Sequence, residues 1–223
     1  MPLQREDVTR AALSLLDQVG LDRLTIRRLA SYLNIQGASL YWHFTNKQEL
    51  LNSMAEVMVA DAFADLRPPE ADQDWATWLA GYARLLRRLM LGHRDGTRLL
   101  AEADLFISPF FTSIDLALQI LSDAGFGARQ ALTSVITILD YVVGDAFYLQ
   151  ADPSRIALQE SDKLALLQHH FVDSGHFPTL GRLVGELDSS LASNEAWFEE
   201  GLRLLLDGMR VALSQQRVHP RRR

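Results

Sequence analysis

The spacing of hydrophobic and polar positions along the chain predicts helices almost throughout. Apolar residues recur at intervals of three and four, and no segment keeps the two-residue alternation of a strand. The fold class is therefore predicted to be all-α. The predicted helices are 6–19, 26–33, 38–44, 46–65, 75–92, 95–101, 109–123, 128–151, 162–173 and 194–215, with loops at 152–161 and 174–193.

The helices before residue 46 are short and closely spaced, which is typical of a helix-turn-helix. Gly20 is predicted to cap the first helix at its C-terminus, and Thr25 to cap the second at its N-terminus. A turn is expected at 34–37, because its terminal residues Asn34 and Gly37 both tolerate a positive φ. A third helix then follows.

Asn46 begins the next predicted helix, and Glu49, three residues later, completes a capping box. The pair Pro68-Pro69 is the clearest break in the chain. These signals predict a helix-turn-helix domain at 1–46, a connecting helix at 47–66 and a larger helical domain at 67–216. A basic tail at 217–223 is predicted to be disordered.

Composition narrows the classes of protein to consider. The 223-residue chain lacks cysteine, which excludes disulfides and thiolate metal sites. It has neither a long uncharged apolar run nor an apolar leader, so we expect a cytoplasmic protein without membrane contact. The net charge of −6 is unevenly spread. Residues 1–50 carry six basic and five acidic side chains, whereas 51–220 carry 13 and 23, so the N-terminal region is compatible with DNA binding.

The predicted third helix has side chains suited to the major groove of DNA, which is about 12 Å wide. Leu40 and Phe44 are four residues apart and face the core, which leaves Ser39 and the three aromatic residues 41–43 pointing outward. Lys47 adds a positive charge beside a helix N-terminus, where phosphates bind. The alternative is a plain three-helix core with buried aromatics. Three consecutive aromatic residues cannot all face one core, however, and exposed aromatics usually mark binding.

Segments 24–30, 34–44 and 46–51 together resemble the DNA-binding domain of the TetR family. The motif L-Y-W-H-x-x-N-K-x-x-L-L at 40–51, together with L-G-H-R-D-G at 91–96, resembles the tetracycline-repressor branch of this family. This resemblance implies that Arg27 reads a guanine edge and that Gly37, Ala38 and Ser39 form the base-reading entry of the recognition helix. The DNA-binding residues predicted in this way are Thr25, Arg27, Gly37, Ala38, Ser39, Tyr41, Trp42, His43 and Lys47. Because Gly37 and Ala38 have little side chain, base discrimination is expected to depend on Arg27, on Ser39 and on packing of Ala38 against thymine methyl groups.

Two helices of the larger domain have more apolar surface than one chain needs. Segment 128–151 is apolar around most of its circumference, and 194–215 carries two apolar stripes, of which one is expected to face its own domain and the other a partner. The resemblance implies a four-helix homodimer interface; the alternative is one large core. The predicted interface residues are Val135, Val142, Phe147, Trp197, Gly201, Leu205, Gly208 and Ala212.

The remaining helices are expected to enclose a cavity for a small effector. Its candidate residues are Tyr82, Leu86, Leu100, Phe106, Phe110, Phe111, Ile114, Leu139 and Asp140, although each apolar member also suits an ordinary core. Asp140 faces the cavity, the dimer interface or solvent. In the tetracycline-repressor branch a histidine binds a drug–magnesium chelate, but the matching residue here is Leu100, and the drug-contacting positions are Phe63 and Tyr82. We therefore expect a mostly apolar effector, with no metal and no cofactor.

Other functions have weaker support in the sequence. His93-Arg94-Asp95 is similar to a kinase catalytic loop but lacks the accompanying glycine-rich loop and asparagine. A metal site at His169, His170 and His176 is also weakly supported, because only His169 and His170 share a predicted helix and they are adjacent, not on one face. We predict a non-enzymatic, ligand-responsive repressor that binds a palindromic double-stranded DNA operator as a homodimer. The alternative is an architectural or activating DNA-binding protein without an effector. Release is expected through a swing of helix 46–65.

Overall fold

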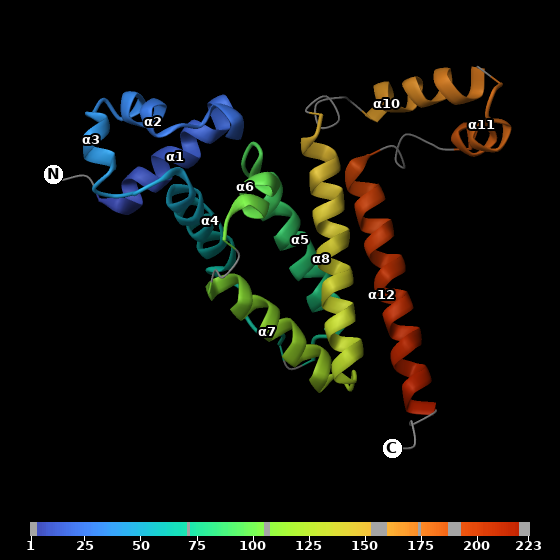
Figure 1. The fold of residues 1–223 in the computed structure, drawn as a ribbon. Helices are drawn as coiled ribbons and strands as arrows, with labels where there is room; N and C mark the ends of the chain where they lie inside the picture. Colours follow the sequence, from blue (N-terminus) through green and yellow to red (C-terminus); the bar gives the residue numbers. More distant parts are fainter. Residues whose placement is uncertain are drawn as a thin grey trace. The chain divides into compact units, whose positions relative to one another are not determined.

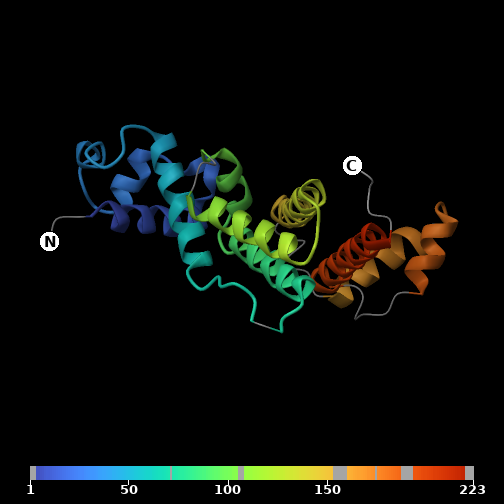
Figure 2. The same ribbon diagram turned by 90° about the horizontal axis from the view of Figure 1, so that it is seen from below.

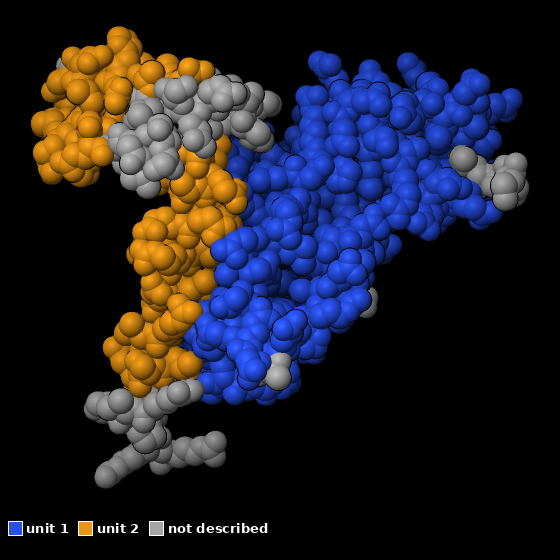
Figure 3. Space-filling model, turned by 180° about the vertical axis from the view of Figure 1, so that it is seen from behind, with its two compact units in different colours: residues 1–150 blue, residues 151–223 orange. Residues whose placement is uncertain are grey.

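A computed structural model describes residues 4–70, 72–104, 108–152, 160–173, 175–186 and 193–218. The chain forms two compact units, 1–150 and 151–223, which Figure 3 colours separately and which are described in turn. All regular elements in the described residues are helical, which confirms the predicted fold class. The division into units follows packing, and the functional boundaries predicted from the sequence remain predictions.

Unit 1 consists of a small N-terminal bundle joined by a long helix to a group of larger helices (Figures 1 and 2). That long helix, α4, packs against α1 on one side and against α5, α6 and α7 on the other. The main pairing of the larger group is between α5 and α8. The elements are α1 (Arg5–Val19), η1 (Leu21–Arg23), α2 (Ile26–Tyr32), α3 (Gly37–Leu40), α4 (Lys47–Phe63), α5 (Trp75–Leu91), α6 (Gly96–Glu102), α7 (Ser108–Asp123) and α8 (Ala128–Gln150).

Local capping accounts for most boundaries of the small bundle. Gly20 ends α1 with a φ of 77°, a backbone conformation in which a Cβ is strained. Thr25 Oγ1 accepts a hydrogen bond from the Arg28 N–H at 3.1 Å, and Asn46 Oδ1 accepts one from the Glu49 N–H at 2.9 Å. The predicted caps at these three positions are therefore confirmed.

Two local predictions in this bundle are wrong in detail. Helix α3 ends at Leu40 and not at residue 44, because a tight turn follows in which the His43 and Phe44 N–H groups both donate to the Leu40 carbonyl. Asn34 has the expected positive φ of 53°, but Gly37 is the first residue of α3 and not part of a left-handed turn. The predicted recognition helix is thus a single helical turn.

Unit 2 contains α10 (Glu160–Leu167), the π-helical turn η2 (Gln168–Asp173), α11 (Pro178–Gly185) and α12 (Asn194–Val218). Helix α11 lies within the predicted loop 174–193; it begins at a proline and packs closely on η2, with Gly181 directly against the Phe171 carbonyl. Helix α12 extends into the predicted basic tail, of which residues 219–223 lie outside the described residues.

Helix α8 is the one helix among the described residues whose length and composition would suit a membrane span. One of its faces is buried, with Val135, Ile138 and Val142 at its centre, and the helix packs on α5. Within the chain, 33% of its apolar window is buried, and length and composition alone are weak evidence for a membrane span.

Candidate nucleic-acid interface and its connection to the helical core

The segment after α3 presents aromatic side chains to solvent. Leu40 and Phe44 are fully buried, as predicted, whereas Tyr41 is 60% exposed and Trp42 is 90% exposed. A tryptophan this exposed contributes little to the core of its own chain. Exposed aromatic side chains beside a short helix form a surface for packing on sugars and base methyl groups.

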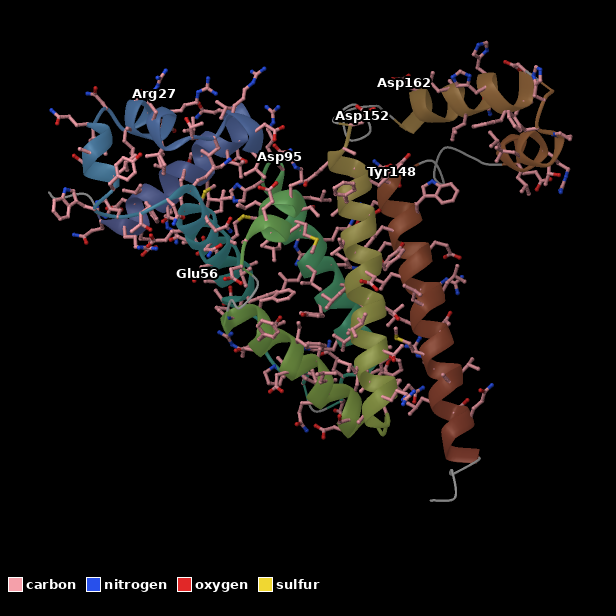
Figure 4. The ribbon with its side chains drawn as sticks, in the orientation of Figure 1. Arg27, Glu56, Asp95, Tyr148, Asp152 and Asp162 are labelled. Carbon is pink, nitrogen blue, oxygen red and sulfur yellow. The ribbon has the colours of Figure 1, made fainter. Side chains whose placement is uncertain are left out.

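The other predicted DNA-binding residues lie around this segment. Arg27 lies on the outer side of α2 and is exposed (Figure 4), and Ala38 and Ser39 are exposed on α3. Thr25 is the cap of α2, and Gly37 and His43 are half-buried. The Lys47 ammonium lies 3.5 Å from the Leu21 carbonyl oxygen. The N-termini of α2 and α3 and the start of α4 therefore supply the predicted surface.

Arg5 and Glu49 form hydrogen bonds with the C-terminal end of the aromatic segment 41–43 and with the residues that follow it. The Arg5 guanidinium donates hydrogen bonds to the His43 carbonyl and the Glu49 carboxylate, both at 2.7 Å, and lies 4.6 Å from the centre of the Phe44 ring. Glu49 accepts hydrogen bonds from the Thr45 N–H and hydroxyl, both at 2.8 Å. Half of the predicted capping box is therefore wrong: the Glu49 side chain accepts from the Thr45 N–H and not from the Asn46 N–H. A role for Arg5 at this surface was not predicted from the sequence, because its partners lie about forty residues further along the chain.

Glu49 makes one part of the stability pH-dependent. Its pKa is lowered from an ordinary value of 4.5 to about 2, chiefly by the Thr45 N–H and then by Arg5. A lowered pKa stabilises the folded state fully above pH 4.5, and this contribution disappears as the pH falls toward 2. The stability difference between the wild type and Glu49→Gln should thus be constant above about pH 5 and narrow below 4.5. Urea unfolding at a series of pH values tests this, and a difference that stays constant to pH 3 would contradict it.

Polar contacts connect the small bundle to the turn between α5 and α6. Asp17, near the end of α1, accepts hydrogen bonds from the Arg94 N–H at 2.9 Å and lies 3.0 Å from His93 Nδ1. Asp95, at the start of α6 (Figure 4), accepts one from the Leu21 N–H at 2.8 Å. These contacts fix the turn 93–96 to the C-terminal end of α1.

Further contacts extend this connection in both directions. Arg98 on α6, which is partly buried, pairs with the exposed Asp22 at 2.8 Å. The pKa of Asp22 is lowered by its hydrogen bonds to Arg98. On the other side, the Gln150 side chain donates to the carbonyls of Met90 and His93 and accepts from the Thr97 N–H, at 2.8 to 3.0 Å. The last residue of α8 is therefore connected through this turn to the bundle.

The predicted effector residues fall into two groups. Tyr82 and Leu86 are fully buried on α5, and Leu100, Phe110, Ile114 and Leu139 are partly buried. Asp140 and Phe111 are exposed on this chain, so Asp140 does not face the interior, and the dimer interface and solvent remain the two alternatives for it. Phe106 lies outside the described residues. The buried and partly buried residues are therefore the predicted effector residues that lie inside unit 1.

Tyr82 is at the centre of an aromatic cluster in this interior. Its ring is stacked between Trp78 at 5.4 Å and Phe63 at 6.2 Å. Its hydroxyl lies 2.9 Å from Ser113 Oγ, which in turn donates to the Phe110 carbonyl at 2.7 Å. Burial raises the pKa of Tyr82 to about 12, so the phenol is neutral at physiological pH. Apart from this hydroxyl pair and the Trp78 indole N–H, which donates to the Arg67 carbonyl at 2.8 Å, the cluster is apolar.

The predicted interface helices expose apolar stripes. On α12, the division into two stripes is confirmed: Phe198, Leu202 and Leu206 are buried, whereas Trp197 and Gly208 are exposed. Gly201, Leu205 and Ala212 are partly exposed. On α8, Val135 and Val142 are buried within the chain itself and have no surface for a partner. The exposed apolar residues of α8 are Leu132, Ile136, Val143, Phe147 and Tyr148.

Comparison with known proteins gives matches along nearly the whole chain. A model of the bacterial regulatory proteins of the tetR family matches residues 8–54, and one of the tetracyclin repressor-like C-terminal domain matches residues 67–213. The chain is 37% identical over 211 residues to the tetracycline repressor protein class A from transposon 1721 of Escherichia coli. That match covers 93% of this chain and 90% of the relative.

Two solved structures are similar as well. A possible TetR family transcriptional regulator from Streptomyces coelicolor A3(2) is 34% identical with a TM-score of 0.75, over 94% of this chain and all of that one. The Streptomyces coelicolor TetR family protein ActR, solved in complex with actinorhodin, is 27% identical with a TM-score of 0.73, over 96% of this chain and 99% of that one.

Proposed function

Because this chain belongs to the TetR family of bacterial regulatory proteins, we propose that it is a cytoplasmic transcriptional repressor that a small effector releases from its DNA operator. The observation that carries this proposal is the exposure of Tyr41 and Trp42 directly after the one-turn helix α3. In the proposed complex, α3 enters the major groove, Arg27 reads a guanine, and the aromatic segment packs on the sugar-phosphate backbone.

A homodimer would give the short helix α3 and the aromatic segment 41–43 enough affinity for the operator. One turn of helix contacts few bases, and a twofold dimer doubles the contact by reading two half-sites about 34 Å apart. The exposed apolar stripes of α8 and α12 support such a dimer, since each is unusual for the surface of a monomer. We propose Leu132, Ile136, Val143 and Phe147 on α8 in place of Val135 and Val142, together with the Trp197 stripe of α12.

The interior of unit 1 supports a mostly apolar effector. The Tyr82 cluster offers aromatic faces and one hydroxyl pair, and the ActR structure shows that a protein of similar fold accommodates actinorhodin. A drug–magnesium chelate does not fit the donors present. The position that supplies a metal-binding histidine in the tetracycline-repressor branch is Leu100, whose side chain has no ligand atom. We therefore propose binding without a metal ion.

The contacts of the turn 93–96 suggest how the effector site acts on the bundle. Gln150, at the end of α8, donates a hydrogen bond to the His93 carbonyl, and Asp95, at the start of α6, accepts one from the Leu21 N–H of the small bundle. The turn is therefore hydrogen-bonded both to α8 and to the bundle. An effector that binds one arrangement of α5–α8 more tightly shifts the population of that arrangement by its difference in affinity. The shift then moves α1 and α4, and the two recognition helices no longer match the spacing of the operator.

A mobility-shift assay on DNA fragments upstream of the gene tests the proposed function. We expect one retarded complex that aromatic, apolar compounds dissociate, and that tetracycline with magnesium does not. Absence of binding to any fragment at low salt would contradict DNA binding altogether, because non-specific binding is strongest there. Stable binding that no compound in the panel weakens would favour the architectural alternative.

Trp42→Ala should weaken operator binding by about 30-fold or more, because loss of a central aromatic anchor costs roughly 2 kcal/mol. The folded state should be unaffected, since the side chain is 90% exposed. Tyr32→Ala is the matched control: Tyr32 is also exposed, but it lies at the end of α2 and hydrogen-bonds Gln18 on α1. Equal affinities for the two variants would exclude Trp42 from the interface.

A further inference from the structure

The recognition segment has little structure of its own. Helix α3 is four residues long, and an isolated helix of this length is unstable in water. The three residues after it, Tyr41 to His43, form a turn whose first two side chains are exposed. The orientation of these side chains toward DNA therefore depends on contacts with the rest of unit 1.

Arg5 supplies such contacts from the first turn of α1. One guanidinium nitrogen donates to the His43 carbonyl, which ends the aromatic segment, and to Glu49 on α4. The guanidinium also lies over the ring of Phe44, which anchors the segment in the core. A single side chain thus connects α1, the aromatic segment and α4.

Glu49 holds the same segment from the other side. One carboxylate oxygen is paired with Arg5, and the other accepts both hydrogen bonds of Thr45. Charge-assisted hydrogen bonds are among the stronger ones in proteins, and this carboxylate makes three of them within 2.8 Å. His43, Phe44 and Thr45 are therefore fixed consecutively.

We propose that Arg5 and Glu49 form a positioning pair that sets the orientation of the aromatic segment 41–43 for DNA binding. This inference rests on the DNA-binding function proposed above. The pair acts within the protein and does not itself contact DNA. The alternative role for Arg5, whose side chain is 49% exposed, is a direct phosphate contact.

The two roles predict opposite effects for Glu49→Gln. Removal of a carboxylate near DNA strengthens binding if only charge matters, because the negative potential facing the phosphates decreases. If Glu49 positions the segment, the same substitution weakens binding. Arg5→Gln weakens binding in both cases, but a lost phosphate contact also reduces the slope of log K against log salt by about 0.9 for each protomer, or about 1.8 for the dimer.

Operator affinity should be measured over a range of salt concentrations for Arg5→Gln, Glu49→Gln, Arg5→Lys and the double variant. We expect each Gln variant to bind about 10-fold more weakly with an unchanged salt slope, and the double variant to be no weaker than the single ones. Arg5→Lys should recover part of the affinity. Arg10→Gln is the matched control, because Arg10 is on the same helix and equally exposed but pairs with Glu6 and Asp61.

Three outcomes would overturn the proposal. A reduced salt slope for Arg5→Gln, with undiminished binding by Glu49→Gln, would make Arg5 a phosphate contact. Wild-type affinity in all variants would show that the segment keeps its orientation without the pair. Failure of the wild type to bind any fragment would remove the proposed function and this inference together, whereas the first two outcomes leave DNA binding intact. Thermal unfolding of each variant shows whether a loss of affinity reflects unfolding.

Discussion

Gly96→Ala should destabilise the protein by about 3 kcal/mol, since overpacking beside a rigid backbone costs this much. A Cβ at position 96 would lie 2.5 Å from the Met90 carbonyl oxygen, far inside van der Waals contact. The carbonyl is part of the α5 backbone and accepts a hydrogen bond from Gln150, so it cannot move alone. Urea unfolding measures the loss of stability.

The same substitution has a functional consequence. Displacement of the turn 93–96 separates Asp95 from the Leu21 N–H and Arg94 from Asp17, which are the contacts that hold the small bundle. We therefore expect weaker operator binding even at temperatures where Gly96→Ala remains folded. The matched control is Gly81→Ala in the exposed part of α5, where a Cβ meets no atom within 4 Å. That change should stabilise the protein by up to about 1 kcal/mol, and equal effects at both positions would refute the steric argument.

The features that the sequence predicts well are those set by neighbouring residues. Gly20, Thr25 and Asn46 end or begin helices because of their own backbone and side-chain chemistry, and they do so in the structure. Burial of Leu40 and Phe44 follows from their four-residue spacing. Exposure of Trp42 follows from the same pattern, since the aromatic residues beside it cannot all enter one core.

The features that the sequence did not predict depend on distant partners. Arg5 donates hydrogen bonds to the His43 carbonyl and to Glu49, and no local pattern connects these positions, which lie about forty residues apart. Helix α11 was predicted as a loop because its stability depends on packing against η2. On α8, an apolar pattern around the whole helix could not separate buried Val135 from exposed Ile136, since the positions of α5, α6 and α7 decide which face is covered.

The buried ion pair between α5 and α8 gives the other large expected effect. Arg87 Nε donates to the Asp145 carboxylate at 2.6 Å, and the two side chains are only 11% and 18% exposed. Loss of one partner leaves a charge in a poorly solvated site, and the cost of breaking such a pair is about 3–5 kcal/mol. Arg87→Met should therefore unfold at a much lower urea concentration than the wild type.

A second substitution separates the charge from the packing. In Arg87→Met combined with Asp145→Leu, no charge remains buried, and apolar replacement of a whole pair is often close to neutral. The double variant should thus recover most of the lost stability. Arg203→Met on α12 is the control, because the Arg203 guanidinium is exposed and its ion pairs with Glu200 and Asp207 are solvated, so its unfolding midpoint should change much less. If the double variant were as unstable as Arg87→Met, the loss would come from the packing of the Arg87 stem and not from the unpaired carboxylate.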